Sequence, residues 1–290
     1  MILVTGATGT IGQHLVPSLL ESGRHVRALI RPRGDRQVTL PPQVNIANGD
    51  PAHIATLDAA LEGVSQVFLC IGNGPQQEWA EQNIVAQAAK AGVERIVKVS
   101  APVVGDDAPV AIARMHHRIE QAIVATGMAY TFLRPGSFMQ NLLQQSPLVA
   151  ARGQLLGSTG DAPINQIDAR DIADVAAVAL TSGTIDGAVP LTGSRAYTMQ
   201  EIADLISQVT QRRITFVNLT PQEHRRVLEA QSLPEWLVHH ILEIQAMARS
   251  HPERPNDKVL RLTGRAPREL PDFLRHQASA FGTRQPPHAA

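Results

Sequence analysis

The stretch VTGATGTIG, residues 4–12, decides the fold. Its glycines, Gly6, Gly9 and Gly12, lie three residues apart; an apolar run precedes them and the amphipathic stretch Ile11–Glu21 follows. In a strand–turn–helix unit the first glycine permits a tight turn, the second lets the backbone approach a pyrophosphate, and the third lets the helix pack closely on the strand. The stretch therefore predicts a dinucleotide site at the start of a helix, where free N–H groups meet the diphosphate.

Outward from this motif, short apolar runs alternate with longer amphipathic stretches about six times. This alternation predicts an α/β fold, with a doubly wound parallel Rossmann sheet and helices on both of its faces. The second half is less regular and predicts a small C-terminal α/β substrate lobe. Strands are predicted at 1–4, 25–30, 44–47, 66–71, 95–99, 130–133, 189–192 and 214–219. Helices are predicted at 11–21, 54–61, 78–91, 111–125, 172–180, 199–210 and 223–247, the last of them broken near Pro234.

The predicted domain organisation follows from this change of pattern. Residues 1–152 are expected to form the NAD(P)-binding Rossmann domain, with segments from 164–194 returning to it. Residues 153–290 are expected to be mainly substrate lobe and C-terminal tail.

The composition narrows the classes of function. The 26 basic residues balance the 26 acidic ones, so the sequence shows no electrostatic footprint for nucleic acid or an acidic membrane. The single Cys70 excludes an internal disulfide and a multi-cysteine metal site, and no metal is expected. No apolar run approaches the roughly 18 residues of a membrane span. We expect a soluble cytoplasmic protein with a small-molecule substrate and leave a homodimer open.

The residue that follows the second strand indicates which dinucleotide is bound. Arg31 lies 19 residues after Gly12, where an acid would bind a ribose 2′-hydroxyl and an arginine accommodates a 2′-phosphate. Arg31, with Arg33 as a second contributor, therefore favours NADP(H) over NAD(H). Asp50 closes the third strand in the sequence Asn-Gly-Asp and is interpreted either as a ligand near the adenine or as a turn residue.

Several motifs in order resemble the atypical short-chain dehydrogenase/reductase superfamily, in its NmrA-like group. They are TGATGTIG at 5–12, Arg31, Gly49-Asp50, VKVSA at 97–101, HHRIEQAIVATGMAYTFLRPGSFMQN at 116–141, IDARDIADV at 167–175 and LTGRAPRELPDFL at 262–274. The similarity covers nearly the whole chain and is greatest to NAD(P)H-binding, quinone-oxidoreductase-like members.

The resemblance implies that loops at the carboxyl ends of the strands hold the cofactor. Carried over position by position, the cofactor-binding residues would be Gly6, Thr8, Gly9, Thr10, Ile11, Gly12, Arg31, Asp50, Ile71, Gly72, Asn73, Ser100, Pro135, Gly136 and Phe138.

The superfamily usually works with a Tyr and a Lys four residues later on one helix, and this chain lacks that pair. Tyr130 is followed by Arg134, and Tyr197 by Glu201. On the helix where the pair belongs, His116 and Glu120 are four residues apart and share a face. Two interpretations stay open: His116 handles a proton or contacts ribose while Glu120 orients it, or the two form an ordinary, partly exposed ion pair.

These features predict an NADPH-dependent oxidoreductase that acts on a small apolar carbonyl, quinone or similar electrophile. The cofactor would supply the hydride, and the protein would supply position and a closed pocket. Two alternatives are a non-catalytic regulator that senses NAD(P), and a non-redox dehydratase or cyclase on the same fold, because a fold does not determine a function.

Overall fold

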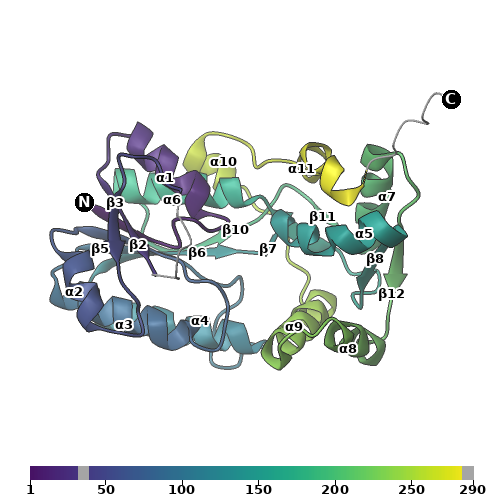
Figure 1. The fold of residues 1–290 in the computed structure, drawn as a ribbon, viewed down its shortest axis with the longest axis horizontal. Helices are drawn as coiled ribbons and strands as arrows, with labels where there is room; N and C mark the ends of the chain where they lie inside the picture. Colours follow the sequence, from purple (N-terminus) through teal and green to yellow (C-terminus); the bar gives the residue numbers. More distant parts are fainter. Residues whose placement is uncertain (32–38, 283–290) are drawn as a thin grey trace. The chain divides into compact units, whose positions relative to one another are not determined.

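The structure is a computed structural model that describes residues 1–31 and 39–282 (Figure 1). Its described residues form two compact units, each built from three pieces of chain. Unit 1 contains Met1–Pro135, Ala169–Leu191 and Lys258–Arg265, and unit 2 contains Gly136–Asp168, Thr192–Asp257 and the residues from Ala266 onward. The first passage from unit 1 to unit 2 follows Pro135, earlier than the boundary expected after residue 152, and the chain returns to unit 1 at Ala169. Arg33 lies outside the described residues.

Unit 1 is built around a seven-stranded sheet in the order β10-β6-β5-β4-β1-β2-β3. Every neighbouring pair of strands is parallel. The doubly wound parallel sheet predicted from the alternation is therefore confirmed. The strands are β1 (Ile2–Thr5), β2 (Val26–Ile30), β3 (Asn45–Asn48), β4 (Gln66–Leu69), β5 (Arg95–Val99), β6 (Ala129–Pro135) and β10 (Gly187–Leu191).

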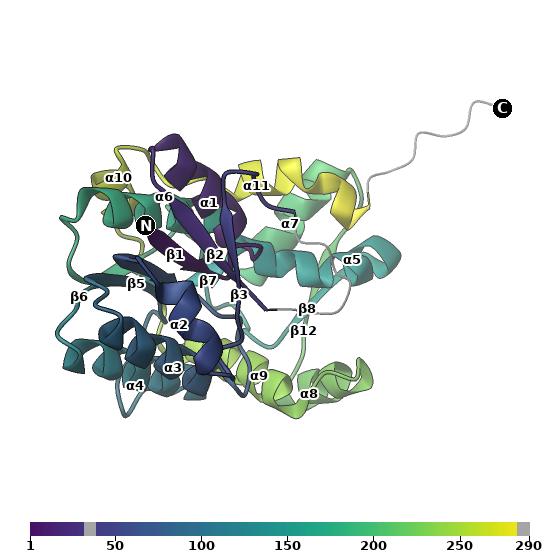
Figure 2. The same ribbon diagram turned by 60° about the vertical axis from the view of Figure 1, so that its left-hand side comes forward.

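Helices cover both faces of this sheet. On one face lie α1 (Gly12–Glu21), α6 (Ala169–Ser182) and α10 (Lys258–Thr263), and on the other lie α2 (Ala55–Leu61), α3 (Gln77–Lys90) and α4 (Ala111–Ala125) (Figures 1 and 2). A sheet buried on both faces explains why the strands read as near-continuous apolar runs rather than as alternating ones.

The core on the α3 and α4 side joins residues from five strands and three helices. Phe132 of β6, Ile96 of β5 and Val67 of β4 contribute from the sheet, and Ile84 and Ile119 contribute from the helices. All five are at most 3% exposed. Burial of apolar area on this scale is the main favourable contribution to folding.

Backbone contacts at two glycines bring β1 and α1 together. Gly6 has a φ of +64°, and a Cβ there would lie 2.5 Å from the carbonyl oxygen of Cys70, which directly follows β4. A Cβ at Gly12 would collide with the carbonyl oxygen of Gly6 and lie 2.7 Å from the Cα of Ala7. The turn therefore closes tightly because these two positions carry no side chain.

Unit 2 is a mixed α/β body with two small sheets, β11-β9-β7 and β12-β8. Its apolar core is formed by residues such as Leu155, Ile202, Phe273, Leu274 and Phe281. Its elements are β7 (Ser137–Phe138), η1 (Met139–Gln145), α5 (Ser146–Arg152), β8 (Gln154–Gly157), β9 (Ile164–Ile167), β11 (Ala196–Tyr197), α7 (Met199–Thr210), β12 (Thr215–Asn218), α8 (Pro221–Ala230), α9 (Glu235–Ser250), α11 (Leu270–His276) and η2 (Ala278–Phe281).

The elements of unit 2 agree with the sequence where capping signals are strong. The predicted helix 199–210 coincides with α7, whose N-cap Thr198 forms a capping box with Glu201. The break that the sequence predicts near Pro234 in the stretch 223–247 is confirmed, because α8 ends at Ala230 and α9 begins after Pro234. The short strands β7, β8, β9 and β11 have no counterpart among the predicted strands.

The close approach at Gly12 generates a stability prediction. Gly12→Ala should lower the free energy of unfolding by about 1–3 kcal/mol, the usual cost of overpacking, because the added methyl collides with backbone rather than with a movable side chain. Thermal melts measure the loss. Gly74→Ala is the matched control, since a Cβ there meets nothing within 4 Å. Equal melting temperatures for the two variants would contradict the close-packing argument.

Candidate cofactor site and active site

The strand order of unit 1 identifies the edge where a ligand is expected. From β1 the chain builds β2 and β3 toward one side of the sheet and then β4, β5, β6 and β10 toward the other. The connections therefore diverge between β1 and β4. In open parallel sheets the crevice at the carboxyl ends beside such a switch point is the usual ligand site. The glycine loop follows β1, and the loop Ile71-Gly72-Asn73 follows β4, so both lie at this position.

The glycine loop has the shape that a diphosphate needs. Gly6, Thr8, Gly9 and Thr10 are exposed, whereas Ile11 and Gly12 are buried against the unit. The first N–H groups of α1 have no partner within the helix and carry its partial positive charge. Gly6 and Gly9 leave this exposed loop without side chains at two positions, and such a loop, opening onto a helix N-terminus, fits the pyrophosphate of a dinucleotide.

Arg31 and Asp50 lie together at the ends of β2 and β3. The Nε atom of Arg31 is 3.9 Å from Oδ1 of Asp50, and the two side chains are 42% and 29% exposed. Oδ1 of Asp50 also accepts the N–H of Ala52, as expected of a turn residue. The neighbouring Gly49 allows this turn to approach β2, because a Cβ there would lie 2.8 Å from the Cδ1 atom of Leu29. Asp50 thus forms the turn and remains within reach of Arg31.

The segment after β4 is tied to β1 by one hydroxyl group. Oγ1 of Thr5 accepts the N–H of Cys70 at 2.8 Å and donates toward the carbonyl oxygens of Phe68 and Cys70. Gly72 and Asn73 are exposed, and Ile71 is half-buried. Burial, followed by the charge of Glu81, raises the pKa of the Cys70 thiol to about 12. The thiol therefore stays protonated near neutral pH and is a poor nucleophile.

The expected catalytic helix face is turned inward. His116 is 5% exposed and Glu120 is 2% exposed, and both belong to the buried face of α4. The interpretation of these two residues as a partly exposed surface ion pair is therefore wrong. The reason is that Ala113, Ile119 and Ile123 share this face and direct it toward the sheet.

Glu120 has partners that the sequence did not reveal. The guanidinium of Arg134 donates to it with Nη2 at 2.5 Å and Nε at 3.1 Å, which is a two-pronged contact. The hydroxyl of Ser100 donates to Oε1 at 2.6 Å. The carboxylate is thus held at the ends of β5 and β6, so its charge anchors these ends to α4. A signal for the Arg134 contact was available, because an arginine that ends a buried strand needs an acid nearby.

A second buried ion pair was also missed. Lys98 of β5 and Glu81 of α3 are each 0% exposed and contact one another. The two residues lie 17 positions apart on different elements, so no local pattern in the sequence connects them. Glu81 also accepts the N–H of Ile71, in the loop after β4.

The remaining predicted positions fall on both units. Pro135 ends β6 in unit 1, whereas Gly136 and Phe138 belong to unit 2. Within unit 2, Gly136 is in close contact with a carboxyl that sequence reasoning missed, because a Cβ at Gly136 would collide with Oε2 of Glu253. Burial raises the pKa of Glu253 from its ordinary 4.5 to about 7.

Neither tyrosine substitutes for the missing Tyr–Lys pair. Tyr130 lies in β6 and stacks on Phe132, with ring centroids 4.5 Å apart. Tyr197 is buried in β11 under the guanidinium of Arg195, and burial raises the pKa of its hydroxyl. A tyrosine in a strand or buried in this way lacks the helical lysine neighbour that the superfamily reaction normally uses.

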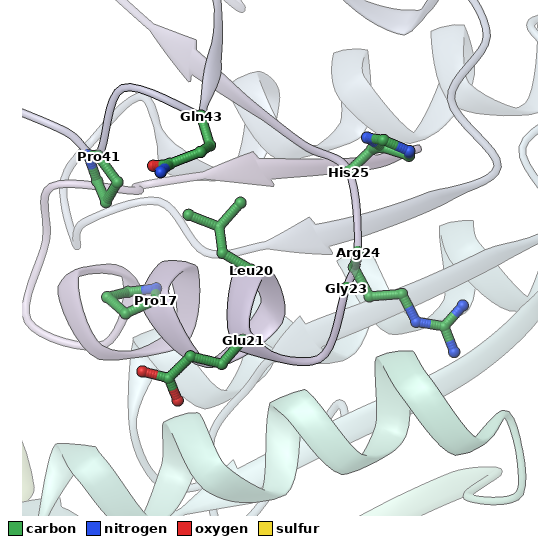
Figure 3. Close-up of a pocket in the computed structure, with 8 residues that line it drawn as sticks. All are labelled: Pro17, Leu20, Glu21, Gly23, Arg24, His25, Pro41 and Gln43. Carbon is green, nitrogen blue, oxygen red and sulfur yellow. The ribbon is translucent and has the colours of Figure 1, made fainter.

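An open depression of about 570 Å³ lies elsewhere on unit 1 (Figure 3). Leu20 of α1 points toward Gln43, and Arg24 and His25 border the far side. His25 precedes β2 and Gln43 precedes β3, so this depression lies at the amino ends of the strands. It is therefore separate from the glycine loop, which follows a carboxyl end.

The described residues contain neither a candidate membrane span nor a candidate metal site. Across 1–31 and 39–282, no helix is long and apolar enough to cross a membrane. Nor do three or more His, Cys, Asp or Glu side chains in this part of the chain converge to hold a metal ion.

Comparison with known proteins agrees with this geometry. The sequence profile of the NmrA-like family matches residues 1–273. The chain belongs to the NmrA-like family. The resemblance drawn from the ordered motifs is thereby confirmed.

Individual relatives of this NmrA-like chain are reductases. It is 34% identical over 284 residues to NAD(P)H azoreductase of Xenophilus azovorans, which covers 97% of this chain and 99% of that protein. It is 35% identical over 283 residues to (4-alkanoyl-5-oxo-2,5-dihydrofuran-3-yl)methyl phosphate reductase of Streptomyces griseus, with the same coverage. An NADPH-dependent quinone oxidoreductase of Escherichia coli, solved with NADPH, shares the fold with a TM-score of 0.85 at 24% identity, over 95% of this chain and 99% of that one.

The pKa of Glu253 gives the NmrA-like chain a predictable pH dependence. Because the folded pKa is about 7 and the ordinary value is 4.5, the unfolded chain gives up this proton first as pH rises. Stability linked to Glu253 is complete below pH 4.5 and is lost as pH rises through about 7. In Glu253→Gln the melting temperature should therefore change less with pH between 4.5 and about 7 than in wild type. Above pH of about 7 the melting temperature of the variant should be higher than that of wild type. Parallel curves for the two proteins, or equal flattening by Glu235→Gln at an exposed acid of the same unit, would contradict this expectation.

Proposed function

We propose that this chain is an NADPH-dependent reductase of small, largely apolar electrophiles of the quinone or azo class. The observation that carries the proposal is the side-chain-free cradle of Gly6, Gly9 and Gly12 at the switch point of the sheet. Further support comes from full-length relatives that are an NAD(P)H azoreductase and a reductase of an oxo-dihydrofuran ester.

In this proposal the backbone of the glycine loop and the start of α1 bind the diphosphate. Arg31 binds the 2′-phosphate of the adenosine ribose, because its guanidinium presents paired donors that match phosphate oxygens. The bound dinucleotide supplies a hydride, which is chemistry that no side chain offers. The cofactor-binding set that we propose within unit 1 is Gly6, Thr8, Gly9, Thr10, Ile11, Gly12, Arg31, Asp50, Ile71, Gly72, Asn73, Ser100 and Pro135. Gly136 and Phe138, which belong to unit 2, stay predictions from the sequence.

The roles of the α4 residues are proposed from their contacts. Glu120 does not transfer a proton, because both of its oxygens accept charge-assisted hydrogen bonds from Arg134 and one also accepts from Ser100. It anchors the ends of β5 and β6 beside the cofactor edge. His116 is the remaining titratable group on this face and is proposed to supply or relay the proton that accompanies the hydride. A cytoplasmic location and a homodimer stay predictions from the sequence.

The reaction itself is testable by NADPH oxidation. The wild-type protein should oxidise NADPH in the presence of a small quinone or an azo dye, followed by nicotinamide absorbance. His116→Gln should lower turnover by roughly 10²–10⁴-fold, the usual contribution of a positioned acid or base, with a much smaller change in NADPH affinity. Wild-type turnover in the variant would remove the proton role from His116.

Two other outcomes would replace the proposed function. Tight cofactor binding without turnover of any electrophile would indicate a regulator that senses NAD(P). Conversion of substrate with no change in nicotinamide absorbance would indicate a dehydratase or cyclase. Loss of NADPH binding in a folded Gly9→Asp variant is the control that links either activity to the glycine loop.

Cofactor preference follows from the charge at the end of β2. A hydrogen bond to a charged group contributes about 1.5–3 kcal/mol, so NADPH should bind roughly 10–100-fold more tightly than NADH. Arg31→Asp should reverse this order, because the new carboxylate repels the phosphate and accepts from a 2′-hydroxyl. Calorimetry measures the dissociation constants for NADPH and NADH on wild type and on Arg31→Asp. Lys90→Asp makes the same charge change on the exposed end of α3 and should leave the preference intact. Equal wild-type affinities would end the assignment of Arg31.

A further inference from the structure

The buried pair of Lys98 and Glu81 is the most unusual polar feature of unit 1. Lys98 is among the largest fully buried side chains of the molecule, and Glu81 is equally inaccessible. Besides its contact with Glu81, the Nζ atom of Lys98 donates to the carbonyl oxygen of Val99 at 3.0 Å. The pair thus connects the carboxyl end of β5 to the first half of α3.

Stability alone gives a poor explanation for charges at this place. Removing two charges from water is costly, and an apolar pair of similar volume is often as stable or more so. Lys98 lies on the same face of β5 as Ile96, and Glu81 lies about one turn before Ile84 on α3. Both isoleucines belong to the apolar core, into which leucine or methionine would also pack. The hydrogen bonds that the Glu81 carboxylate accepts offer a better explanation for the buried charges.

Glu81 ties the start of one loop to helix α3. Its Oε1 atom accepts the N–H of Ile71 at 3.4 Å and the side-chain Nε2 of Gln77 at 3.1 Å. Lys98 occupies the other oxygen, Oε2. The lysine thus fixes the orientation of the carboxylate and leaves Oε1 directed at the loop. The segment 71–77 runs from the loop after β4 to the first residue of α3. The Ile71 contact therefore ties the loop to the helix, and the Gln77 contact lies within α3.

This loop has little packing of its own. A Cβ at Gly72 or at Gly74 would meet no atom within 4 Å among the described residues. A loop with two glycines and open space around them has many accessible conformations. The contact of Glu81 with Ile71, which also packs against the apolar core, therefore restricts how the loop leaves β4.

The same loop lies directly beside the glycine loop. β4 is paired with β1 in parallel, and Gly6 packs against the carbonyl oxygen of Cys70, the residue before Ile71. A shift of the segment 71–77 would therefore change the surface next to the diphosphate cradle. The buried pair is connected to that surface through two residues of backbone.

We propose that Lys98 and Glu81 are positioning residues of the dinucleotide site, which fix the segment 71–77 in the conformation that receives the cofactor. This inference rests on the proposed function for its ligand. The tether itself concerns the protein without cofactor. Neither residue is proposed to touch the reacting atoms.

The test compares two double variants that both remove the charges. Lys98→Met with Glu81→Leu leaves the N–H of Ile71 without its acceptor, whereas Lys98→Met with Glu81→Gln keeps an amide oxygen there. Three quantities are measured: the melting temperature, hydrogen exchange of the segment 71–77 without cofactor, and the dissociation constant for NADPH. Arg95→Met is the matched control, because Arg95 pairs with Asp186 at the opposite end of the same strand.

The expected results separate positioning from stability. The single variant Lys98→Met leaves a buried charge and should lower the melting temperature by roughly 6–15 °C. Both double variants should recover most of this loss. The leucine variant should still exchange faster in 71–77 and bind NADPH about 3–10-fold more weakly, the value of one hydrogen bond. The glutamine variant should be close to wild type in the exchange of 71–77 and in NADPH affinity. Arg95→Met should change only the melting temperature.

Wild-type exchange and affinity in the leucine double variant would overturn the proposal. If that variant does not fold, Lys98→Met with Glu81→Met removes the same acceptor with a side chain closer in length to glutamate, and unaltered exchange in 71–77 overturns the proposal equally. Failure of the wild-type protein to bind NADPH would refute the proposed function instead, while the exchange measurement would still decide whether Glu81 tethers the loop.

Discussion

The close approach of backbone to backbone at Gly6 and Gly12 is the constraint on which the rest of unit 1 depends. It lets α1 start almost directly above the end of β1, so the helix N-terminus is directed at the edge where the sheet connections diverge. A side chain at Gly12 would separate helix and strand and move that partial charge away from the edge, and one at Gly6 would separate the turn from the segment after β4. The close approach at the anion site thus depends on the absence of side chains at these two positions.

Buried charge has a complementary role on the other face of the sheet. Glu81 and Glu120 reach from α3 and α4 to Lys98 and Arg134, each near the carboxyl end of a neighbouring strand. Apolar side chains would hold these helices against the sheet but would not specify how far each slides along it. A charged pair has one good geometry and many poor ones, so it determines the position of the loops that follow the strands. The conformational accuracy of the ligand edge comes from these contacts.

The sequence predicted what depends on local pattern and missed what depends on distant partners. The helix 111–125 was predicted to the residue, because its apolar face is periodic and Gly127 follows its end. Strands of two residues such as β11 are defined by their ladder partners and leave no periodic signal. The burial of His116 depends on what covers α4, which a helical repeat does not reveal. Likewise, the raised pKa of Glu253 is produced by surroundings folded around an ordinary loop residue.

The division of the chain into interleaved pieces affects how the protein can be taken apart. Unit 1 needs Ala169–Leu191 for its last strand and one of its helices, and it needs Lys258–Arg265 for another helix. A fragment that stops at Pro135 would leave β6 as a bare edge and one face of the sheet without α6 and α10. On a ribosome, the first unit can complete its sheet only after β10 has emerged. Unit 1 is therefore expected to finish folding late in synthesis. A split or fused version of the protein should place its break inside an exposed loop, because a break at a unit boundary would separate pieces of the same unit.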